Sequence, residues 1–260
     1  MEASQTARSE AANILEARGL RREFLGFVAV DDVNLDVPTG AIHALIGPNG
    51  AGKTTCFNLL SKFIAPSAGT IQFDGRDITT LEADQVARIG MSRSFQISAV
   101  FGNLTVLENV RLSLQARDLG NAFDFWRSRS QLKRFDEEAY TLIERVRLSD
   151  VAHMRACHLP YGRKRTLEIA ATLALSPKLL LLDEPTAGMT EEGVQQIIEL
   201  ISEIRAGRTV LMVEHNLSVV KSLCDKVTVL MRGRVIAEGN YDEVASDPLV
   251  MSAYLGTDEC

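Results

Sequence analysis

The stretch Gly47-Pro48-Asn49-Gly50-Ala51-Gly52-Lys53-Thr54 decides the fold of this chain. It matches the pattern G-x-x-x-x-G-K-[ST] at every fixed position. Residues 41–46 before it are predicted to form a buried strand, and residues 53–63 a helix that ends before Pro66. Glycines let backbone amides curl around an anion, and the start of the helix adds its positive end. The sequence therefore predicts a strand–loop–helix unit that binds phosphate groups; the alternative is a glycine-rich turn that arose by chance.

Each part of this loop has a predicted role toward a nucleoside phosphate. Lys53 is expected to reach the β- and γ-phosphates, and the Thr54 hydroxyl to ligate Mg²⁺. Backbone amides are expected to supply the other contacts. The predicted nucleotide-binding residues of the loop are Gly47, Pro48, Asn49, Gly50, Ala51, Gly52, Lys53, Thr54 and Thr55.

A second segment places two acids at the end of an apolar run. Leu179-Leu180-Leu181-Leu182 is followed directly by Asp183 and Glu184. Such a strand is buried and delivers the acids to the carboxyl edge of a sheet, where ligands bind in open α/β folds. We expect Asp183 to hold Mg²⁺ through water and Glu184 to act as the general base toward water. The alternative is an acidic turn in solvent.

The rest of the chain alternates between strand and helix patterns around these two segments. Residues 14–37 and 70–75 are predicted to form a small antiparallel sheet, and residues 97–160 a mainly helical insert. Further expected elements are strands at 178–183, 209–213, 227–231 and 235–237, with an amphipathic helix at 192–204. Fully apolar strands that alternate with helices favour a parallel sheet covered by helices. The predicted fold class is α/β, a P-loop NTPase (RecA-like) core with an antiparallel β subdomain and an inserted α-helical subdomain.

Composition excludes several other classes. The 260 residues include 46% hydrophobic and 24% charged residues, which excludes collagen-like, disordered and coiled-coil chains. The net charge of −6 argues against a general nucleic-acid binder. No apolar run approaches the roughly 18 residues of a membrane span, and the polar opening 1–10 lacks the apolar region of a secretory signal. The four cysteines show no metal-ligand spacing and are expected to be reduced thiols.

Several further segments make the sequence resemble the ATP-binding subunits of ABC transporters. Ser94-Phe95-Gln96 resembles the glutamine loop of that family, and Leu159-Pro160-Tyr161-Gly162-Arg163 stands at the family's signature. Residues 184–190 resemble the exit of the acidic strand and the D-loop, and Val213-Glu214-His215 resembles the histidine switch. Phe24 resembles the aromatic residue that stacks on adenine. These segments cover the chain from about residue 14 to residue 255.

A closer resemblance is to the subfamily of these ATPases that serves branched-chain amino acid importers. Arg93-Ser94-Phe95-Gln96 together with residues 101–109 resembles the glutamine-loop region of that subfamily. The insert near residues 123–135, which contains Trp126, resembles an extension common in it. Tyr161-Gly162 and the terminal Ala253-Tyr254-Leu255-Gly256 resemble it as well.

The resemblance implies roles for residues that the motifs alone leave open. Gln96 would bind Mg²⁺ or the attacking water, and His215 would bond the γ-phosphate. Two chains would sandwich two ATP molecules, so that Tyr161 and Gly162 would face the nucleotide of the partner chain. Phe24 is preferred over Phe27 for adenine stacking. Three positions depart from the family pattern, with Pro160, Arg163 and Thr190 where it usually has Ser, Gln, and Asp or Asn.

The resemblance also implies what the protein works with. The catalytic residues would be Lys53, Gln96, Glu184 and His215, the metal ligands Thr54, Gln96 and Asp183, and the cofactors ATP and Mg²⁺. Expected partners are a second copy or a sister ATPase, integral membrane permease subunits and, indirectly, a periplasmic or extracellular solute-binding protein, with no nucleic acid. The expected function is uptake of amino acids, branched-chain ones first, by a peripheral subunit at the cytoplasmic face of the membrane. The alternatives are an export-side ABC ATPase of the lipopolysaccharide-extraction type and a soluble ABC ATPase outside transport.

The expected domain organisation follows from the same segments. Residues 1–12 form a tail, 13–96 and 161–240 the nucleotide-binding core with its β subdomain, 97–160 the helical signature subdomain, and 241–260 a C-terminal segment.

Overall fold

The computed structural model describes the backbone of residues 12–94, 100–118 and 129–255. Gln96 and Trp126 lie outside these ranges, so the roles expected of Gln96 and the resemblance of the insert around Trp126 stay predictions. Within the described ranges, none of the helices has both the length and the hydrophobicity of a membrane-spanning segment.

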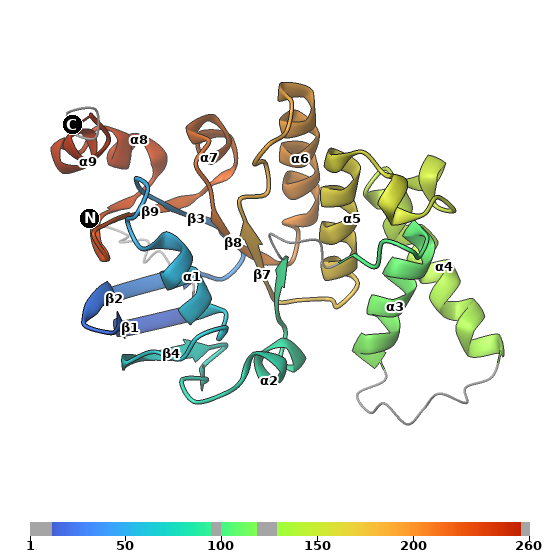
Figure 1. Cartoon of the computed structure of the whole chain (residues 1–260), viewed down its shortest axis with the longest axis horizontal. Coiled ribbons are helices and arrows are strands. Elements are labelled where there is room, and N and C mark those ends of the chain that lie inside the picture. The colour runs from blue at the N-terminus through green and yellow to red at the C-terminus, as the bar shows by residue number, and fades with distance from the viewer. Residues whose placement is uncertain (1–11, 95–99, 119–128, 256–260) are drawn as a thin grey trace, which may run out of the picture.

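The centre of the molecule is a six-stranded sheet with the order β10-β9-β3-β8-β7-β6 (Figure 1). Its strands are β3 (Ile42–Ile46), β6 (Met91–Ser94), β7 (Leu179–Asp183), β8 (Thr209–Val213), β9 (Lys226–Met231) and β10 (Arg234–Gly239). All neighbours are parallel except β9 and β10, which form an antiparallel hairpin. Every residue of β3, β7 and β8 is buried, as expected for parallel strands covered on both faces.

The second sheet is antiparallel, with the order β2-β1-β4-β5. Its strands are β1 (Asn13–Phe24), β2 (Phe27–Pro38), β4 (Ala68–Phe73) and β5 (Arg76–Asp77). The sequence predicted short strands here, whereas β1 and β2 each run for 12 residues. They continue to a tight turn in which Leu25 and Gly26 both have positive φ, 47° and 89°.

Helices cover the central sheet and form a separate group at one end of the molecule. They are α1 (Lys53–Leu60), α2 (Ala83–Arg88), α3 (Val106–Asp118), α4 (Arg129–Arg145), α5 (Tyr161–Leu173), α6 (Glu191–Ile204), α7 (Leu217–Leu223), α8 (Tyr241–Ala245) and α9 (Pro248–Leu255), with short 3₁₀ turns at Ser149–Val151 and Ala156–His158. The helix expected over 53–63 ends three residues early, at Leu60. The Ser61 hydroxyl bonds the carbonyl of Phe57 and Lys62 turns left-handed, with φ 62°, which stops the helix.

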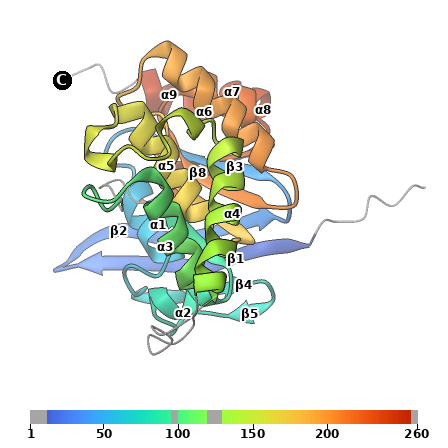
Figure 2. The ribbon, with the colours of Figure 1, turned by 90° about the vertical axis from the view of Figure 1, so that its right-hand side faces the viewer.

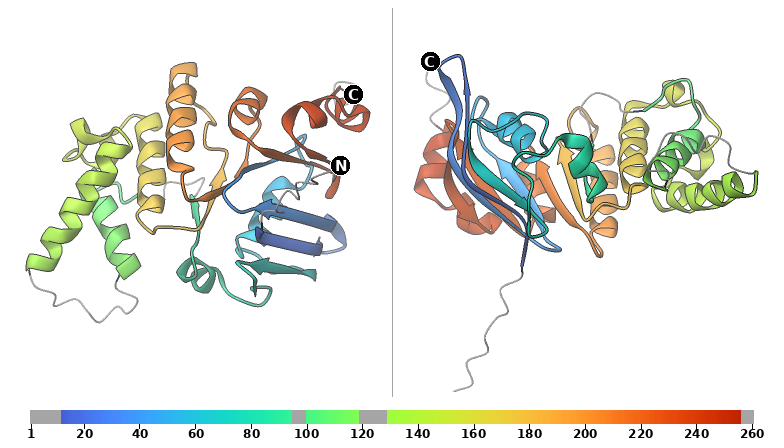
Figure 3. Two further views of the ribbon diagram at one scale, coloured as in Figure 1. Left: turned by 180° about the vertical axis from the view of Figure 1, so that it is seen from behind. Right: turned by 90° about the horizontal axis from the view of Figure 1, so that it is seen from below.

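The helical insert is built on the pair α3 and α4, which lie side by side in Figure 2. Three ion pairs link the described parts of the two helices: Arg117 Nη1 to Glu138 Oε1 at 2.7 Å, Arg111 Nη1 to Asp136 Oδ1 at 3.0 Å, and Arg134 Nη2 to Asp118 Oδ2 at 3.1 Å. Seen from below, this pair and the antiparallel sheet lie at opposite ends of the molecule (Figure 3).

Two hydrophobic cores meet at the central sheet. Leu180 and Leu182 of β7 belong to the core that also contains α3, α5 and α6. Leu179 and Leu181 belong to the core beneath the antiparallel sheet, which also contains α1. Because successive side chains of a strand point to opposite faces, the Leu-rich run fills both cores at once. It therefore places Asp183, the last residue of β7, and Glu184, the next residue, at the sheet edge between the two cores.

Candidate nucleotide site

The phosphate loop is seated on the ends of neighbouring strands. Gly52, with φ 96°, is the N-cap of α1, which begins at Lys53. A Cβ at Gly47 would overlap the carbonyl oxygen of Leu230 in β9, and one at Gly52 would overlap that of Ala29 in β2. Both glycines are therefore required by close backbone packing as well as by their positive φ.

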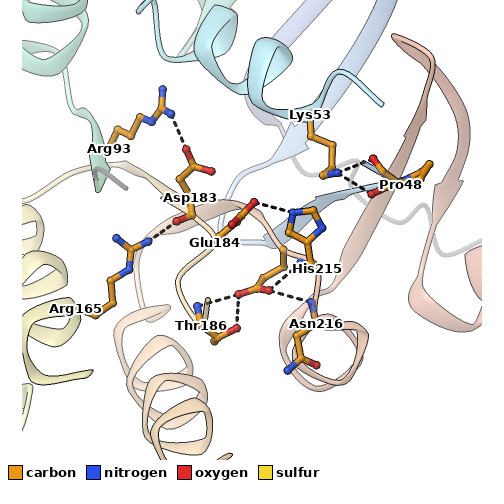
Figure 4. Close-up of polar contacts among 11 residues, drawn as sticks. Pro48, Lys53, Arg93, Arg165, Asp183, Glu184, Thr186, His215 and Asn216 are labelled. Atoms are coloured by element: carbon orange, nitrogen blue, oxygen red, sulfur yellow. Dashed lines mark hydrogen bonds and ion pairs between the residues drawn. The ribbon is translucent and has the colours of Figure 1, made fainter. Parts of the chain in front are cut away.

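Lys53 is the cation of the loop. Its Nζ donates to the carbonyl oxygens of Gly47, at 2.7 Å, and Pro48, at 2.9 Å (Figure 4). Burial lowers the pKa of Lys53, while the negative charge of Glu184 opposes that shift. The Thr54 side chain is exposed at the first turn of α1. The loop thus offers an ammonium group and a hydroxyl at a helix N-terminus, where phosphate groups are bound.

Asp183, at the end of β7, is held by two arginines. Its carboxylate Oδ2 lies 2.7 Å from Arg93 Nη2, and its backbone carbonyl accepts a bond from Arg165 Nη2 (Figure 4). The guanidinium of Arg93 also stacks over the rings of Phe57 and Phe63, at 4.7 and 5.0 Å from their centroids. Sequence reasoning assigned no role to either arginine. The sequence signal for Arg93 was its place between apolar and small residues in the short strand β6, because a buried arginine needs an anionic partner.

The donor set at this edge fits Mg²⁺. Hard oxygen ligands, here the Thr54 hydroxyl and the Asp183 carboxylate, are what that ion prefers, and Asp183 Oδ1 forms no hydrogen bond with the described residues. Among the residues that the structure describes, no group of three or more His, Cys, Asp or Glu side chains is arranged to hold a metal ion. Water and nucleotide phosphates would therefore have to complete the coordination, as is usual for Mg²⁺. Gln96, the third predicted ligand, lies outside the described residues.

Glu184 and His215 are brought together by adjacent strands. Asp183 of β7 pairs with Val213 of β8, so the segments that follow these two strands leave the sheet at the same edge. The Nε2 of His215 lies 2.7 Å from Oε1 of Glu184, and both side chains are partly accessible to solvent. Glu184 adopts a left-handed backbone, with φ 47°. Such conformations are costly for a non-glycine residue and tend to occur at functional sites.

Glu214 is bonded to the segments that carry both side chains of this pair. It is the main residue whose role was not predicted from the sequence. It is only 3% exposed, and its carboxylate accepts four hydrogen bonds. Oε1 accepts from the backbone N and the hydroxyl of Thr186, at 3.0 and 2.6 Å. Oε2 accepts from the backbone N of His215 and of Asn216, at 2.9 and 3.1 Å (Figure 4). The sequence signal for Glu214 was its place directly before His215. Its contact with Thr186 could not be predicted from that signal, because it depends on the register of β7 and β8.

The predicted signature residues open α5. Pro160 is the N-cap of this helix, Tyr161 is exposed, and Gly162 lies against the side chain of Met189. Arg163 pairs with Asp150 at 2.5 Å. Because α5 packs into the core on the opposite face of the sheet from α1, the structure does not bring Tyr161 and Gly162 to the phosphate loop of the same chain.

Phe24 and Phe27 flank the turn between β1 and β2. Both are exposed, Phe27 more than Phe24. The guanidinium of Arg22 lies 4.6 Å from the centroid of the Phe24 ring and covers one face of it. Between them Leu25 is fully exposed at the turn. Both candidates for adenine stacking therefore remain accessible.

Comparison with known proteins defines the class of this chain. The model of the ABC transporter family matches residues 30–187, and the chain belongs to that family. A second profile, for branched-chain amino acid ATP-binding cassette transporters, matches residues 234–260. Members of the family hydrolyse ATP to power transport, and the chain is an ATPase of this kind. The family resemblance and the P-loop NTPase fold expected from the sequence are thereby confirmed.

Individual relatives cover nearly the whole chain. The chain is 36% identical over 249 residues, 94% of its length and 98% of the relative's, to the high-affinity branched-chain amino acid transport ATP-binding protein LivG of Salmonella typhimurium. It is 34% identical over 246 residues, 94% of its length and 98% of the relative's, to the lipopolysaccharide export system ATP-binding protein LptB of Acidithiobacillus ferridurans. Among solved structures it is similar to the ADP conformation of MJ1267, an ATP-binding cassette of an ABC transporter. That likeness has a TM-score of 0.82 and 30% identity, and covers 94% of this chain and 99% of the other.

Proposed function

We propose that this chain is the ATP-hydrolysing subunit of an importer for branched-chain amino acids. The contact that carries the proposal is the 2.7 Å approach of Glu184 and His215 at the strand edge beside Lys53. It supplies a carboxylate and an imidazole at the place where a γ-phosphate held by the loop would be attacked. The match of residues 234–260 to the branched-chain amino acid profile and the similarity to LivG support this cargo class.

Hydrolysis would use the side chains in the following way. Lys53 would exchange its bonds to the carbonyls of Gly47 and Pro48 for bonds to the β- and γ-phosphates. Glu184 would accept a proton from the attacking water, whose oxygen bonds to the γ-phosphorus. The bond from that phosphorus to the bridging oxygen would break, and ADP would leave with the oxygen. His215 would hold Glu184 in place until nucleotide binds and would then donate the same N–H to the γ-phosphate, whose charge must be stabilised for transfer.

Thr54 and Asp183 would hold Mg²⁺, with Gln96 as the third ligand. The ion would neutralise charge on the phosphate oxygens during transfer. Arg93, through its 2.7 Å ion pair, keeps the Asp183 carboxylate oriented at the end of β7.

A second ATPase chain would complete each site. In one chain the N-terminus of α5 lies on the opposite face of the sheet from α1, so its backbone amides cannot reach the chain's own loop. Tyr161 and Gly162 would therefore face the nucleotide of a second copy or of a sister ATPase, where a helix N-terminus favours an anion. Phe24 is the preferred platform for adenine.

The remaining partners would be integral membrane permease subunits, which place this chain at the cytoplasmic face of the membrane. A solute-binding protein outside would act indirectly through the permease, and no nucleic acid would take part. The similarity to LptB keeps lipopolysaccharide export as the alternative function. The C-terminal match over residues 234–260 favours import.

Reconstitution tests the proposal. The transporter complex purified through this subunit would be placed in proteoliposomes with its solute-binding protein, and ATP hydrolysis and leucine uptake would be measured. We expect leucine-loaded binding protein to stimulate hydrolysis several-fold and to drive uptake. A complex that neither responds to leucine, isoleucine or valine nor accumulates them would contradict the importer proposal.

A matched pair of variants separates chemistry from assembly. Glu184→Gln should abolish uptake while the complex still assembles. Glu192→Gln, the same change at an exposed position in the first turn of α6, should leave uptake unchanged. Uptake by the Glu184→Gln complex at the level of the unaltered complex would refute the role of Glu184.

A further inference from the structure

Glu214 is a buried carboxylate that faces hydrogen-bond donors on two sides. It is 3% exposed, and no ion pair to it exists within the described ranges. Three backbone amides and one hydroxyl supply its four hydrogen bonds. Burying a carboxylate is costly unless such bonds replace its hydration. Since a neutral amide offers one oxygen and a donor group, it could not accept all four bonds.

The four donors belong to two different chain segments. Thr186 lies two residues after Glu184, in the turn that follows β7. His215 and Asn216 open the segment that follows β8. One carboxylate oxygen binds each segment, so Glu214 joins the two turns that carry the facing side chains. Figure 4 shows Thr186, which follows Glu184, and Asn216, which follows His215, on the two turns that these bonds join.

The geometry of the pair depends on these turns being fixed. Glu184 has φ 47°, a strained conformation that persists only where neighbouring bonds hold it. Its own N–H donates to the carbonyl of Val213 at 2.9 Å, and Glu214 holds the same turn two residues further on. On the other side, the backbone N of His215 is bonded directly to Glu214.

We propose that Glu214 is a positioning residue for hydrolysis. It sets the distance between Glu184 and His215 by joining the exits of β7 and β8 through one carboxylate. The inference rests on the hydrolytic roles proposed for that pair, and it adds a residue whose carboxylate is bonded to four protein donors. A 1 Å error in the placement of catalytic groups lowers rates by about a hundredfold.

A double-mutant cycle measures whether Glu214 acts through His215. The variants are Glu214→Gln, which keeps the size of the side chain, His215→Ala, and the two combined. We expect Glu214→Gln to lower kcat for ATP hydrolysis by the full-length chain at least about tenfold, with KM changed less than about twofold. In the His215→Ala background, Glu214→Gln should lower kcat by less than about twofold, because the effects of residues that act as a unit are not additive. Equal losses in both backgrounds, or an unchanged kcat, would overturn the inference.

A spectroscopic readout separates this inference from the proposed function. The side-chain nitrogen signal of isotope-labelled His215 reports its contact with Glu184, and His215→Ala identifies the signal among four histidines. Glu214→Gln should move this signal; an unmoved signal overturns the positioning role even if hydrolysis falls. If His215→Ala leaves kcat unchanged, the catalytic role of His215 is wrong, while a moved signal still supports the positioning by Glu214.

Milder variants keep the test decisive if Glu214→Gln does not fold. Thr186→Val removes only the hydroxyl that bonds Oε1 at 2.6 Å, and Thr186→Ser keeps it. We expect kcat to fall with Val and to be restored with Ser. Thr209→Val is the matched control, since it removes a part-buried hydrogen bond, which the hydroxyl accepts from the N–H of Gly40, at the opposite end of β8. It should lower the melting temperature without moving the His215 signal or kcat. Equal effects of Thr186→Val and Thr209→Val on kcat would overturn the proposal.

Discussion

His43 makes the stability of this protein depend on pH in a way that can be calculated. It lies fully buried in β3, the strand that leads into the phosphate loop. Its Nε2 is 2.8 Å from the hydroxyl oxygen of Thr228, which donates its own hydrogen to Glu238 at 2.8 Å. Nε2 is therefore the donor to Thr228, because the hydroxyl hydrogen is already used on Glu238.

Burial lowers the pKa of His43 to about 3, helped by the positive charge of Lys226 and opposed by the backbone carbonyl of Asp36. The unfolded chain, with a pKa near 6.5, takes up a proton at a pH where the folded chain does not. Stability is therefore full above pH 6.5 and is lost as the pH falls. Between about pH 7.5 and about pH 6.0 the linkage relation gives a loss of about 0.8 kcal/mol from this residue alone.

The assay is urea unfolding of the unaltered protein and of His43→Gln at both pH values, which stay above the pI of about 5.4 to limit aggregation. Glutamine keeps an amide donor for Thr228 but does not titrate. Exposed histidines such as His153 and His158 are common to both proteins and cancel in the comparison. The stability advantage of the unaltered protein should shrink by about 0.8 kcal/mol at the lower pH. An advantage that is the same at both pH values would refute the neutral buried imidazole.

Three further predictions concern the nucleotide site and the turn beside it. Lys53→Ala should weaken ATP binding at least about tenfold, because the loop loses its charged donor; calorimetry that finds an unchanged Kd would count against the loop assignment. Gly47→Ala should abolish measurable ATP binding, because its Cβ would overlap the carbonyl of Leu230. The control Gly40→Ala, at φ 80° with open space around it, should lower the stability by only about 1–2 kcal/mol. Equal effects of the two changes on ATP binding and thermal unfolding would contradict the predicted clash at Gly47. Leu25→Asn should raise the stability by about 0.5–1 kcal/mol, because asparagine tolerates the φ of 47° better than leucine; a lower melting temperature would argue against the turn geometry.

Local rules explain why the centre of the site was predictable. The glycines of the phosphate loop are needed for its backbone conformation, which a short stretch of sequence reveals. The apolar run Leu179–Asp183 forms a buried strand, so Asp183 and the following Glu184 come to the end of that strand whatever its place in the sheet. Strand 209–213 was predicted at its observed bounds, since an apolar β-branched run flanked by polar residues leaves little choice.

The rest depends on contacts between distant segments. Glu214 meets Thr186 only because β7 and β8 are adjacent and in one register, and Arg93 meets Asp183 only because β6 pairs with β7. Sequence spacing encodes neither pairing. The end of α1 was misjudged for a different reason, because Pro66 marked a stop whereas the left-handed Lys62 ended the helix earlier.

On the proposed function, this strand edge hydrolyses ATP between two chains. The most direct measurement is analytical ultracentrifugation of the purified Glu184→Gln chain with ATP and Mg²⁺, with the bound nucleotide identified by chromatography. We expect a stable dimer that holds uncleaved ATP, while the unaltered chain returns to monomer with ADP. A Glu184→Gln chain that converts ATP to ADP at the normal rate would contradict it.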